Sequence, residues 1–103
     1  MKEINDQQFK ELSHKKGVYL VDIWAPWCQP CKRLGPILED LSQNYLGSVE
    51  FCKLDADQNP ESCAELGVRS IPTVVILKDG QIVNTLLGLQ PASKYIDALT
   101  KII

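Results

Sequence analysis

The sequence predicts a three-layer α/β domain in which helices cover both faces of a mixed sheet of about five strands. Apolar stretches of strand length alternate with stretches whose apolar residues recur at helical spacing, which is typical of parallel strands joined by crossover helices. Near the carboxyl end, two strand-like stretches flank an Asp-Gly pair, which predicts a hairpin and an antiparallel edge. The chain of 103 residues is long enough for a hydrophobic core, so we expect a single domain over residues 1–103.

The amino-terminal part contains the first strands and the first helix of this alternation. A short strand is expected at residues 2–5, followed by a helix over 7–16 that Asp6 caps and Gly17 ends. Residues 18–24 form a nearly continuous apolar stretch with β-branched and aromatic side chains. This composition predicts a strand that is buried on both faces.

The middle of the chain contains a long helix, a strand and a short helix. The long helix is expected over residues 28–45, and Pro36 should bend it because proline lacks an N–H group and crowds the preceding turn. A strand over 49–55 follows. The short helix begins at Asn59, which precedes a proline, and ends at Gly67.

The carboxyl-terminal part contains the hairpin and a last helix. Strands are expected over residues 73–77 and 81–87, on either side of Lys78-Asp79-Gly80. Pro91 then begins a helix whose apolar residues are Tyr95, Ile96, Leu99, Ile102 and Ile103. The predicted order is therefore strand, helix, strand, helix, strand, helix, strand, strand, helix, with four helices in all.

Composition excludes several classes of function. The net charge is −2 and lysine and arginine form no run, which argues against a nucleic-acid or membrane-surface partner. The first residues contain no apolar stretch of signal-peptide length, and the apolar stretches elsewhere are too short to span a bilayer. We therefore expect a cytoplasmic protein, in which a close pair of cysteines is more often catalytic or metal-binding than structural.

Such a pair occurs in the sequence WAPWCQPCK, where Gln29 and Pro30 separate Cys28 from Cys31. Cys28 lies where a buried strand gives way to a helix, and the free N–H groups at a helix start lower the pKa of a thiol. Cys31 is one turn further along and can reach Cys28 to close a disulfide ring. Pro30 suits the first helical turn and stiffens the pair.

Half of a zinc site is the alternative interpretation of this pair. A closed zinc site needs four ligands, and the remaining candidates, Cys52, Cys63 and His14, do not have ligand spacing. Redox use is therefore favoured, and metal analysis of protein purified without chelator would separate the two. We expect Cys52 and Cys63 to be buried apolar residues, with a regulatory role open for Cys63 if it is exposed.

Two further features interrupt the apolar pattern. Asp22 lies in the strand predicted to be buried, where an ionised carboxylate is costly unless it is paired or protonated. It is either an acid at a strand end that reaches solvent or an acid of raised pKa that moves protons for the cysteines. Lys53 in the next strand is its natural charge partner. Pro72 at the start of a strand indicates an edge position or a cis peptide bond.

These elements together resemble thioredoxin over essentially the whole chain. The matching pieces occur in the family's order and spacing, and they are VDIWAPWCQPCK, Pro36, KLDADQNP, the IPT of residues 71–73, KDG and Gly88. The resemblance implies a thioredoxin fold with Cys28 as an exposed nucleophile and Cys31 as a buried resolving thiol, paired in a redox-active disulfide. It also implies that Asp22 is the buried acid for proton transfer, with Lys53 as its partner.

The resemblance implies a substrate surface as well. Pro72 corresponds to a cis-proline beside the disulfide, and the backbone of Ile71 would pair with an extended substrate segment. Trp27 and Gly88, together with Trp24 and Pro36, correspond to positions that shape the surface around the cysteines.

Gln29 is the departure from the family, which usually has glycine at this position. Gln29 is neutral, so it adds no positive charge that would stabilise a thiolate. The resemblance therefore still implies a general protein-disulfide reductase rather than an oxidase or isomerase. It implies a monomer without a cofactor, which a thioredoxin reductase re-reduces with electrons from NADPH through a flavin or from ferredoxin, and which acts on proteins that contain disulfides. A scaffolding role would add to this activity rather than replace it.

Overall fold

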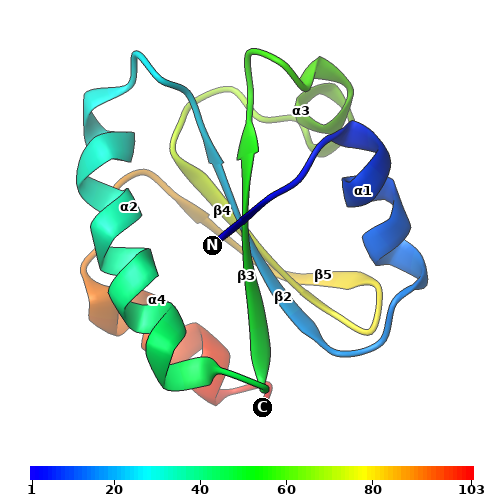
Figure 1. The fold of residues 1–103 in the computed structure, drawn as a ribbon, viewed down its shortest axis with the longest axis vertical. Coiled ribbons are helices and arrows are strands. Elements are labelled where there is room, and N and C mark those ends of the chain that lie inside the picture. The colour runs from blue at the N-terminus through cyan, green and yellow to red at the C-terminus, as the bar shows by residue number, and fades with distance from the viewer.

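The structure is a computed structural model that describes residues 1–103, and it contains five strands and four α-helices in the predicted order (Figure 1). The strands are β1 (Lys2–Glu3), β2 (Val18–Trp24), β3 (Val49–Asp55), β4 (Thr73–Lys78) and β5 (Gln81–Leu87). The helices are α1 (Asp6–Glu11), α2 (Gln29–Ser42), α3 (Pro60–Leu66) and α4 (Ala92–Thr100). Short 3-10 turns at Leu12–His14 and Gln43–Tyr45 extend α1 and α2. The predicted α/β class is confirmed.

The five strands form one mixed sheet in the order β1-β3-β2-β4-β5. The strands β1, β3 and β2 are parallel, whereas β4 runs antiparallel to β2 and β5 antiparallel to β4. The crossover helices and the hairpin therefore produce the expected parallel and antiparallel halves. Strand β2 lies at the centre, and the chain that leaves its carboxyl end leads directly to Cys28.

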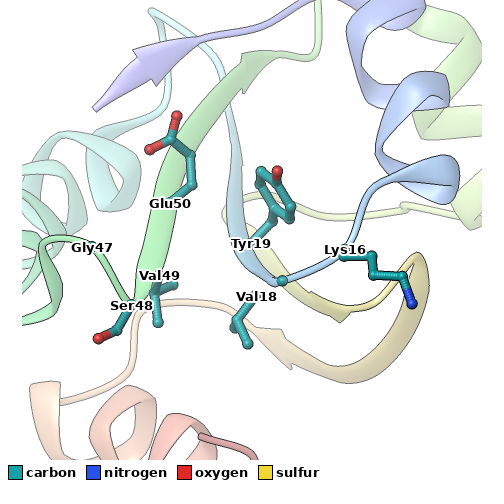
Figure 2. Close-up of a pocket in the computed structure, with 8 residues that line it drawn as sticks. Lys16, Val18, Tyr19, Gly47, Ser48, Val49 and Glu50 are labelled. Atoms are coloured by element: carbon teal, nitrogen blue, oxygen red, sulfur yellow. The ribbon is translucent and has the colours of Figure 1, made fainter.

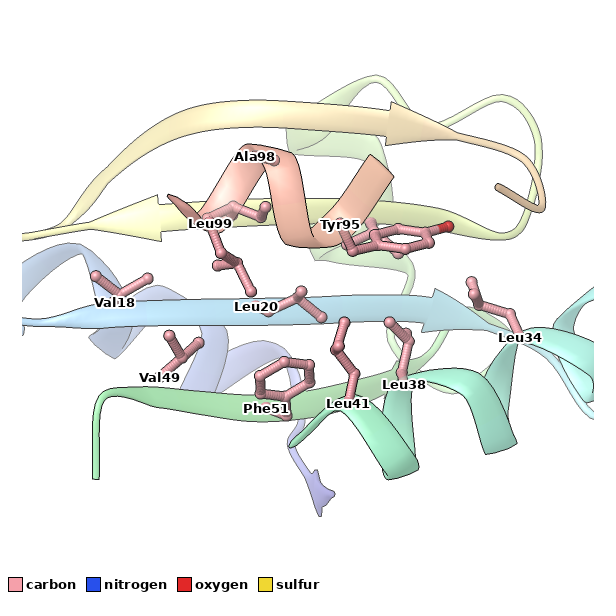
Figure 3. Close-up of a cluster of buried hydrophobic side chains, with 12 residues drawn as sticks. Val18, Leu20, Leu34, Leu38, Leu41, Val49, Phe51, Tyr95, Ala98 and Leu99 are labelled. Carbon is pink, nitrogen blue, oxygen red and sulfur yellow. The ribbon is translucent and has the colours of Figure 1, made fainter. Parts of the chain in front are cut away.

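Helices cover the sheet on both faces (Figure 1). Helices α2 and α4 lie on one face, and Figure 3 shows side chains from both helices directed at β2 and β3. Helices α1 and α3 lie on the other face. Because side chains alternate along a strand, Leu20 packs in the α2/α4 core and its neighbour Val21 in the α1/α3 core. The same alternation places Asp22 on the face that α2 covers.

The prediction that Asp6 caps the first helix is wrong. Asn5 is the cap: its side chain accepts a hydrogen bond from the Gln8 N–H, and the Gln8 side chain accepts one from the Asn5 N–H, both at 2.9 Å. The Asp6 carboxylate accepts hydrogen bonds from the N–H and hydroxyl groups of Ser62, at 2.8 and 2.6 Å. Burial alone would raise the pKa of Asp6, but these hydrogen bonds outweigh it and the pKa lies below its ordinary value. Asp6 thus fastens α1 to the first turn of α3.

Other element boundaries differ from expectation by a few residues. Helix α2 begins at Gln29, with Cys28 as its cap, and it continues through Pro36. The bend expected at Pro36 stays a prediction. Among the apolar residues of α4, Tyr95 and Leu99 are buried and Ile96 is exposed.

The turn of the β4–β5 hairpin explains why Asp79 and Gly80 occur there. Both residues have positive φ angles, of 51° and 86°, as the favoured two-residue hairpin turn requires. A Cβ atom at position 80 would also collide with the backbone carbonyl of Ser13. Only glycine satisfies both conditions at this position.

Candidate active site

The two cysteines of the WCQPC sequence are joined by a disulfide, with their Cα atoms 5.2 Å apart. Cys28 has an extended backbone conformation as the cap of α2, and Cys31 lies in the first turn of that helix. The Cys31 N–H donates a hydrogen bond to the Cys28 sulfur over 3.2 Å. A free helical N–H group therefore already points at the atom that would carry the thiolate charge.

The expectation that Cys28 is exposed is wrong for this disulfide form. Cys28 and Cys31 are each 4% exposed and pack in a small cluster with Ala25, Trp24 and Ile71. The burial of the residues as a whole therefore does not distinguish the two cysteines. The difference between them is their position relative to the helix, since only the Cys28 sulfur accepts a backbone N–H at the helix start.

Asp22 is buried in the middle of the central strand, with 3% of its surface exposed. Its Oδ1 atom has no hydrogen-bond partner. Burial raises the pKa of Asp22 to about 7, and the charge of Lys53 opposes this rise without cancelling it. Asp22 is therefore not an exposed acid at the end of the strand.

Lys53 lies beside Asp22 in the sheet, but the two side chains form no ion pair. They are register partners on the parallel strands β2 and β3. The Lys53 ammonium group instead lies over the Trp24 ring, 4.9 Å from its centroid. Asp22 and Lys53 border one hollow of about 410 Å³, whose other walls include Gly35 and Pro36 of α2. The hollow gives the unpartnered carboxyl group room for solvent.

The surface around the disulfide is partly apolar. Trp27 is 65% exposed, and its indole N–H donates a hydrogen bond to Asp57 over 2.9 Å. The Ile71–Pro72 peptide bond is cis, as the resemblance implied. Pro72 itself is fully buried, whereas Ile71 is half-buried and packs against the cysteine cluster. Ile71, and not the proline ring, therefore offers surface to a partner.

The backbone of Ile71 is free for a partner. Ile71 takes part in none of the backbone hydrogen bonds of the loops and turns. Extended polypeptides bind such unpaired groups in the manner of an added strand.

Gly88 holds the end of β5 against this loop. Its N–H donates to the Pro72 carbonyl over 2.8 Å, and its φ angle of +72° suits glycine. The Tyr95 hydroxyl donates to the Gly88 carbonyl over 3.5 Å. Sequence analysis did not identify Asp57 or Tyr95 as residues of this site, although Asp57 lies within the KLDADQNP segment that carried the resemblance.

The remaining cysteines lie outside this cluster. Cys52 is buried in β3, and burial, helped by the nearby charge of Glu50, raises the pKa of its thiol to about 11. Cys63 is half-buried in α3, and burial also raises its pKa. A raised pKa leaves less of the reactive thiolate at neutral pH. No group of three or more His, Cys, Asp or Glu side chains is placed to hold a metal ion.

A second hollow of about 220 Å³ lies at the opposite end of the sheet, where β2 and β3 begin (Figure 2). Its charged side chains are Lys16 and Glu50, and no cysteine lines it. This hollow therefore lies apart from the Cys28–Cys31 disulfide. None of the helices is both long and apolar enough to cross a membrane.

Comparison with known proteins agrees with this geometry. The family model "Thioredoxin" matches residues 1–101. A thioredoxin of Staphylococcus haemolyticus is 42% identical over 99 residues, which cover 96% of this chain and 94% of the relative. A thioredoxin of Staphylococcus aureus is 46% identical over 87 residues, which cover 84% of each chain.

Proposed function

This chain belongs to the thioredoxin family and is a protein-disulfide reductase, and from that premise we propose separate roles for its two active cysteines. Cys28 is the nucleophile and Cys31 the resolving thiol. The observation that supports this assignment is the hydrogen bond from the Cys31 N–H to the Cys28 sulfur, because it stabilises negative charge on Cys28 alone.

The reaction proceeds in two exchanges. The Cys28 thiolate attacks one sulfur of the substrate disulfide, which forms a mixed disulfide and releases the other sulfur as a thiolate. Cys31 loses its proton and attacks the Cys28 sulfur. This step closes the Cys28–Cys31 disulfide and releases the second substrate thiolate, so two electrons pass from the protein to the substrate.

Asp22 is the base that takes the Cys31 proton, and solvent carries the proton between the two groups. A carboxyl group with a pKa of about 7 can exist in either protonation state at neutral pH, which suits a group that must accept and return a proton. Lys53 keeps the pKa of Asp22 from rising further, because its charge favours the carboxylate.

Trp27, Ile71 and Gly88 bind the substrate. The exposed ring of Trp27 and the free backbone of Ile71 flank the disulfide. Pro72 positions Ile71 as its neighbour in the chain, and Gly88 holds this turn through the hydrogen bond from its N–H to the Pro72 carbonyl.

We further propose that the chain acts as one cytoplasmic monomeric domain. A thioredoxin reductase returns electrons to the Cys28–Cys31 disulfide, so that the protein carries electrons to disulfides of other proteins and maintains the redox state of the cell. The low net charge is compatible with varied protein partners.

Insulin reduction tests the activity directly. We expect a catalytic amount of this protein to speed the precipitation of insulin by dithiothreitol well beyond dithiothreitol alone, because the Cys28 thiolate exchanges faster than an ordinary thiol. Turbidity over time is the measurement. A rate no higher than that with a heat-denatured sample would contradict the proposed function.

Gln29 and Pro30 tune the redox potential, and we expect the effect of Gln29 to be small. Gln29 is the exposed first residue of α2 and carries no charge. Glutamine favours the helix over glycine by up to about 1 kcal/mol, but this acts on both redox forms and largely cancels. Gln29→Gly should therefore move the potential by no more than about 30 mV, or roughly 1.4 kcal/mol.

Titration against glutathione measures this shift. As matched controls, Gln29→His and Gln29→Lys should raise the potential, because a positive charge beside Cys28 stabilises the thiolate form. A shift above about 60 mV for Gln29→Gly would show that Gln29 sets the potential after all. The larger effect of the glycine variant should be on rates with bulky protein substrates.

A further inference from the structure

An open groove of about 500 Å³ runs from Trp27 and Ile71 toward α3. Trp27 and Ile71 form the part of it next to the cysteines, and Ala56, Val68 and Pro60 continue its apolar wall. A substrate that pairs with Ile71 must place its neighbouring residues over this groove. The groove is therefore positioned to distinguish substrates by the residues beside the target cysteine.

Arg69 is the only charged residue among the eight that line the groove. Its side chain is exposed and has no ion pair or side-chain hydrogen bond within the protein. An arginine whose charge no protein group neutralises is available for a carboxylate, which its planar guanidinium group can bind through two parallel hydrogen bonds.

We propose that Arg69 selects substrates that carry an acidic residue near the target cysteine. This inference rests on the proposed role of Ile71 in binding an extended substrate. An extended substrate advances by about 3.3 Å per residue, and Arg69 lines the same groove two positions before Ile71. A substrate residue about two positions from the reactive cysteine therefore lies opposite Arg69. The apolar wall suits an uncharged residue between them.

Short peptides with one cysteine, each supplied as its symmetrical disulfide, test the proposal. Glutamate, glutamine or lysine occupies the position two residues before or two residues after the cysteine. The reduced protein is mixed with each peptide, and the rate constant of oxidation is followed by tryptophan fluorescence, since Trp24 and Trp27 lie beside the disulfide. In one of the two positions, the glutamate peptide should react about three- to tenfold faster than the lysine peptide.

Substitutions assign the preference to Arg69. Arg69→Gln should remove the preference for glutamate and leave the rate with the glutamine peptide unchanged, and Arg69→Glu should reverse it toward lysine. Arg33→Gln is the matched control, because Arg33 is an exposed arginine of α2 outside the groove. Added salt should weaken the preference of the unaltered protein, as for any exposed ion pair.

The outcomes separate this inference from the proposed function. Equal rates for glutamate and lysine peptides, with all three peptides reduced, would overturn the role of Arg69 alone. An equal slowing of all peptides by Arg69→Gln would also overturn it, because it would indicate a structural effect. Failure of the unaltered protein to reduce even the glutamine peptide would overturn the proposed function and this inference together.

Discussion

The Cys28→Ser variant should lose insulin reduction completely. A serine hydroxyl is not ionised at neutral pH and cannot attack a disulfide. The one backbone N–H that donates to a sulfur here points at position 28, so Cys31 lacks the stabilised thiolate that would let it replace Cys28 as the nucleophile. The rate of insulin precipitation should therefore fall to that of dithiothreitol alone. Because serine is close in size to cysteine, the variant should keep its fold, which far-UV circular dichroism checks.

The Cys31→Ser variant should also fail in turnover but for a different reason. Attack by Cys28 still takes place, and the reaction stops at the mixed disulfide because no second thiol resolves it. Incubation with a disulfide-containing protein should thus give a covalent complex on a non-reducing gel, which dithiothreitol removes. The Cys28→Ser variant should give none.

A double variant, with serine at both positions, is the control for these complexes. It retains Cys52 and Cys63, so any complex that it forms reports on those thiols instead. Equal trapping by both single variants, or trapping by Cys28→Ser alone, would refute the assigned roles of the two cysteines.

Replacement of Asp22 should stabilise the protein in a pH-dependent way. The pKa of Asp22 is raised from 3.8 to about 7 by burial. Between these values the unfolded chain has lost the proton that the folded protein retains, so the stability of the unaltered protein falls as the pH rises. A shift of this size corresponds to about 4 kcal/mol. Below about pH 4 both states are protonated and the penalty is absent.

We therefore expect Asp22→Asn and Asp22→Ala to gain stability relative to the unaltered protein as the pH rises from about 4 to 8, by up to about 4 kcal/mol. Urea denaturation of the oxidised proteins at a series of pH values measures the difference. The asparagine variant keeps the size of the side chain, so a gain shared by both variants comes from the charge and not from packing. A difference that does not change with pH would contradict the raised pKa.

The same variants should react more slowly. Without a base for the Cys31 proton, resolution of the mixed disulfide near neutral pH should slow on the order of 100-fold in Asp22→Asn. Raising the pH should restore the rate, because hydroxide then ionises Cys31 directly. An Asp22→Asn protein with unchanged rates and a normal pH profile would remove Asp22 from the mechanism.

Strand β2 shows how far the sequence predicts the fold. Its bounds and its burial on both faces follow from seven residues of apolar and β-branched character, whereas its central place in the sheet was not predicted. The caps of α1 could not be predicted in the same way. Asn5 and Asp6 are both good capping residues, and only the contact of Asp6 with Ser62, 56 positions away, decides between them.

The residues of the candidate site were predicted more fully than the contacts between them. Cys28 and Cys31 were identified by their spacing and by their place at the start of a predicted helix. Asp22 was identified because it interrupts an apolar strand. The contact of Lys53 with Trp24, and the absence of an ion pair between Lys53 and Asp22, depend on side-chain conformations that the sequence pattern does not reveal. The burial of Cys28 likewise depends on Ile71, which joins the cluster from a distant part of the chain.

The central position of β2 has a consequence for how the redox site is held. Strand β2 is paired along both of its edges, with β3 and with β4, so its amide groups belong to the part of a fold that opens last under native conditions. Only a short turn joins this strand to Cys28, whereas fluctuations at β1 or at the edge strand β5 involve other hydrogen bonds. The protein can therefore fray at its margins while the two sulfurs stay within bonding distance. Repeated oxidation and reduction of the cysteine pair then take place beside a strand that local unfolding leaves intact.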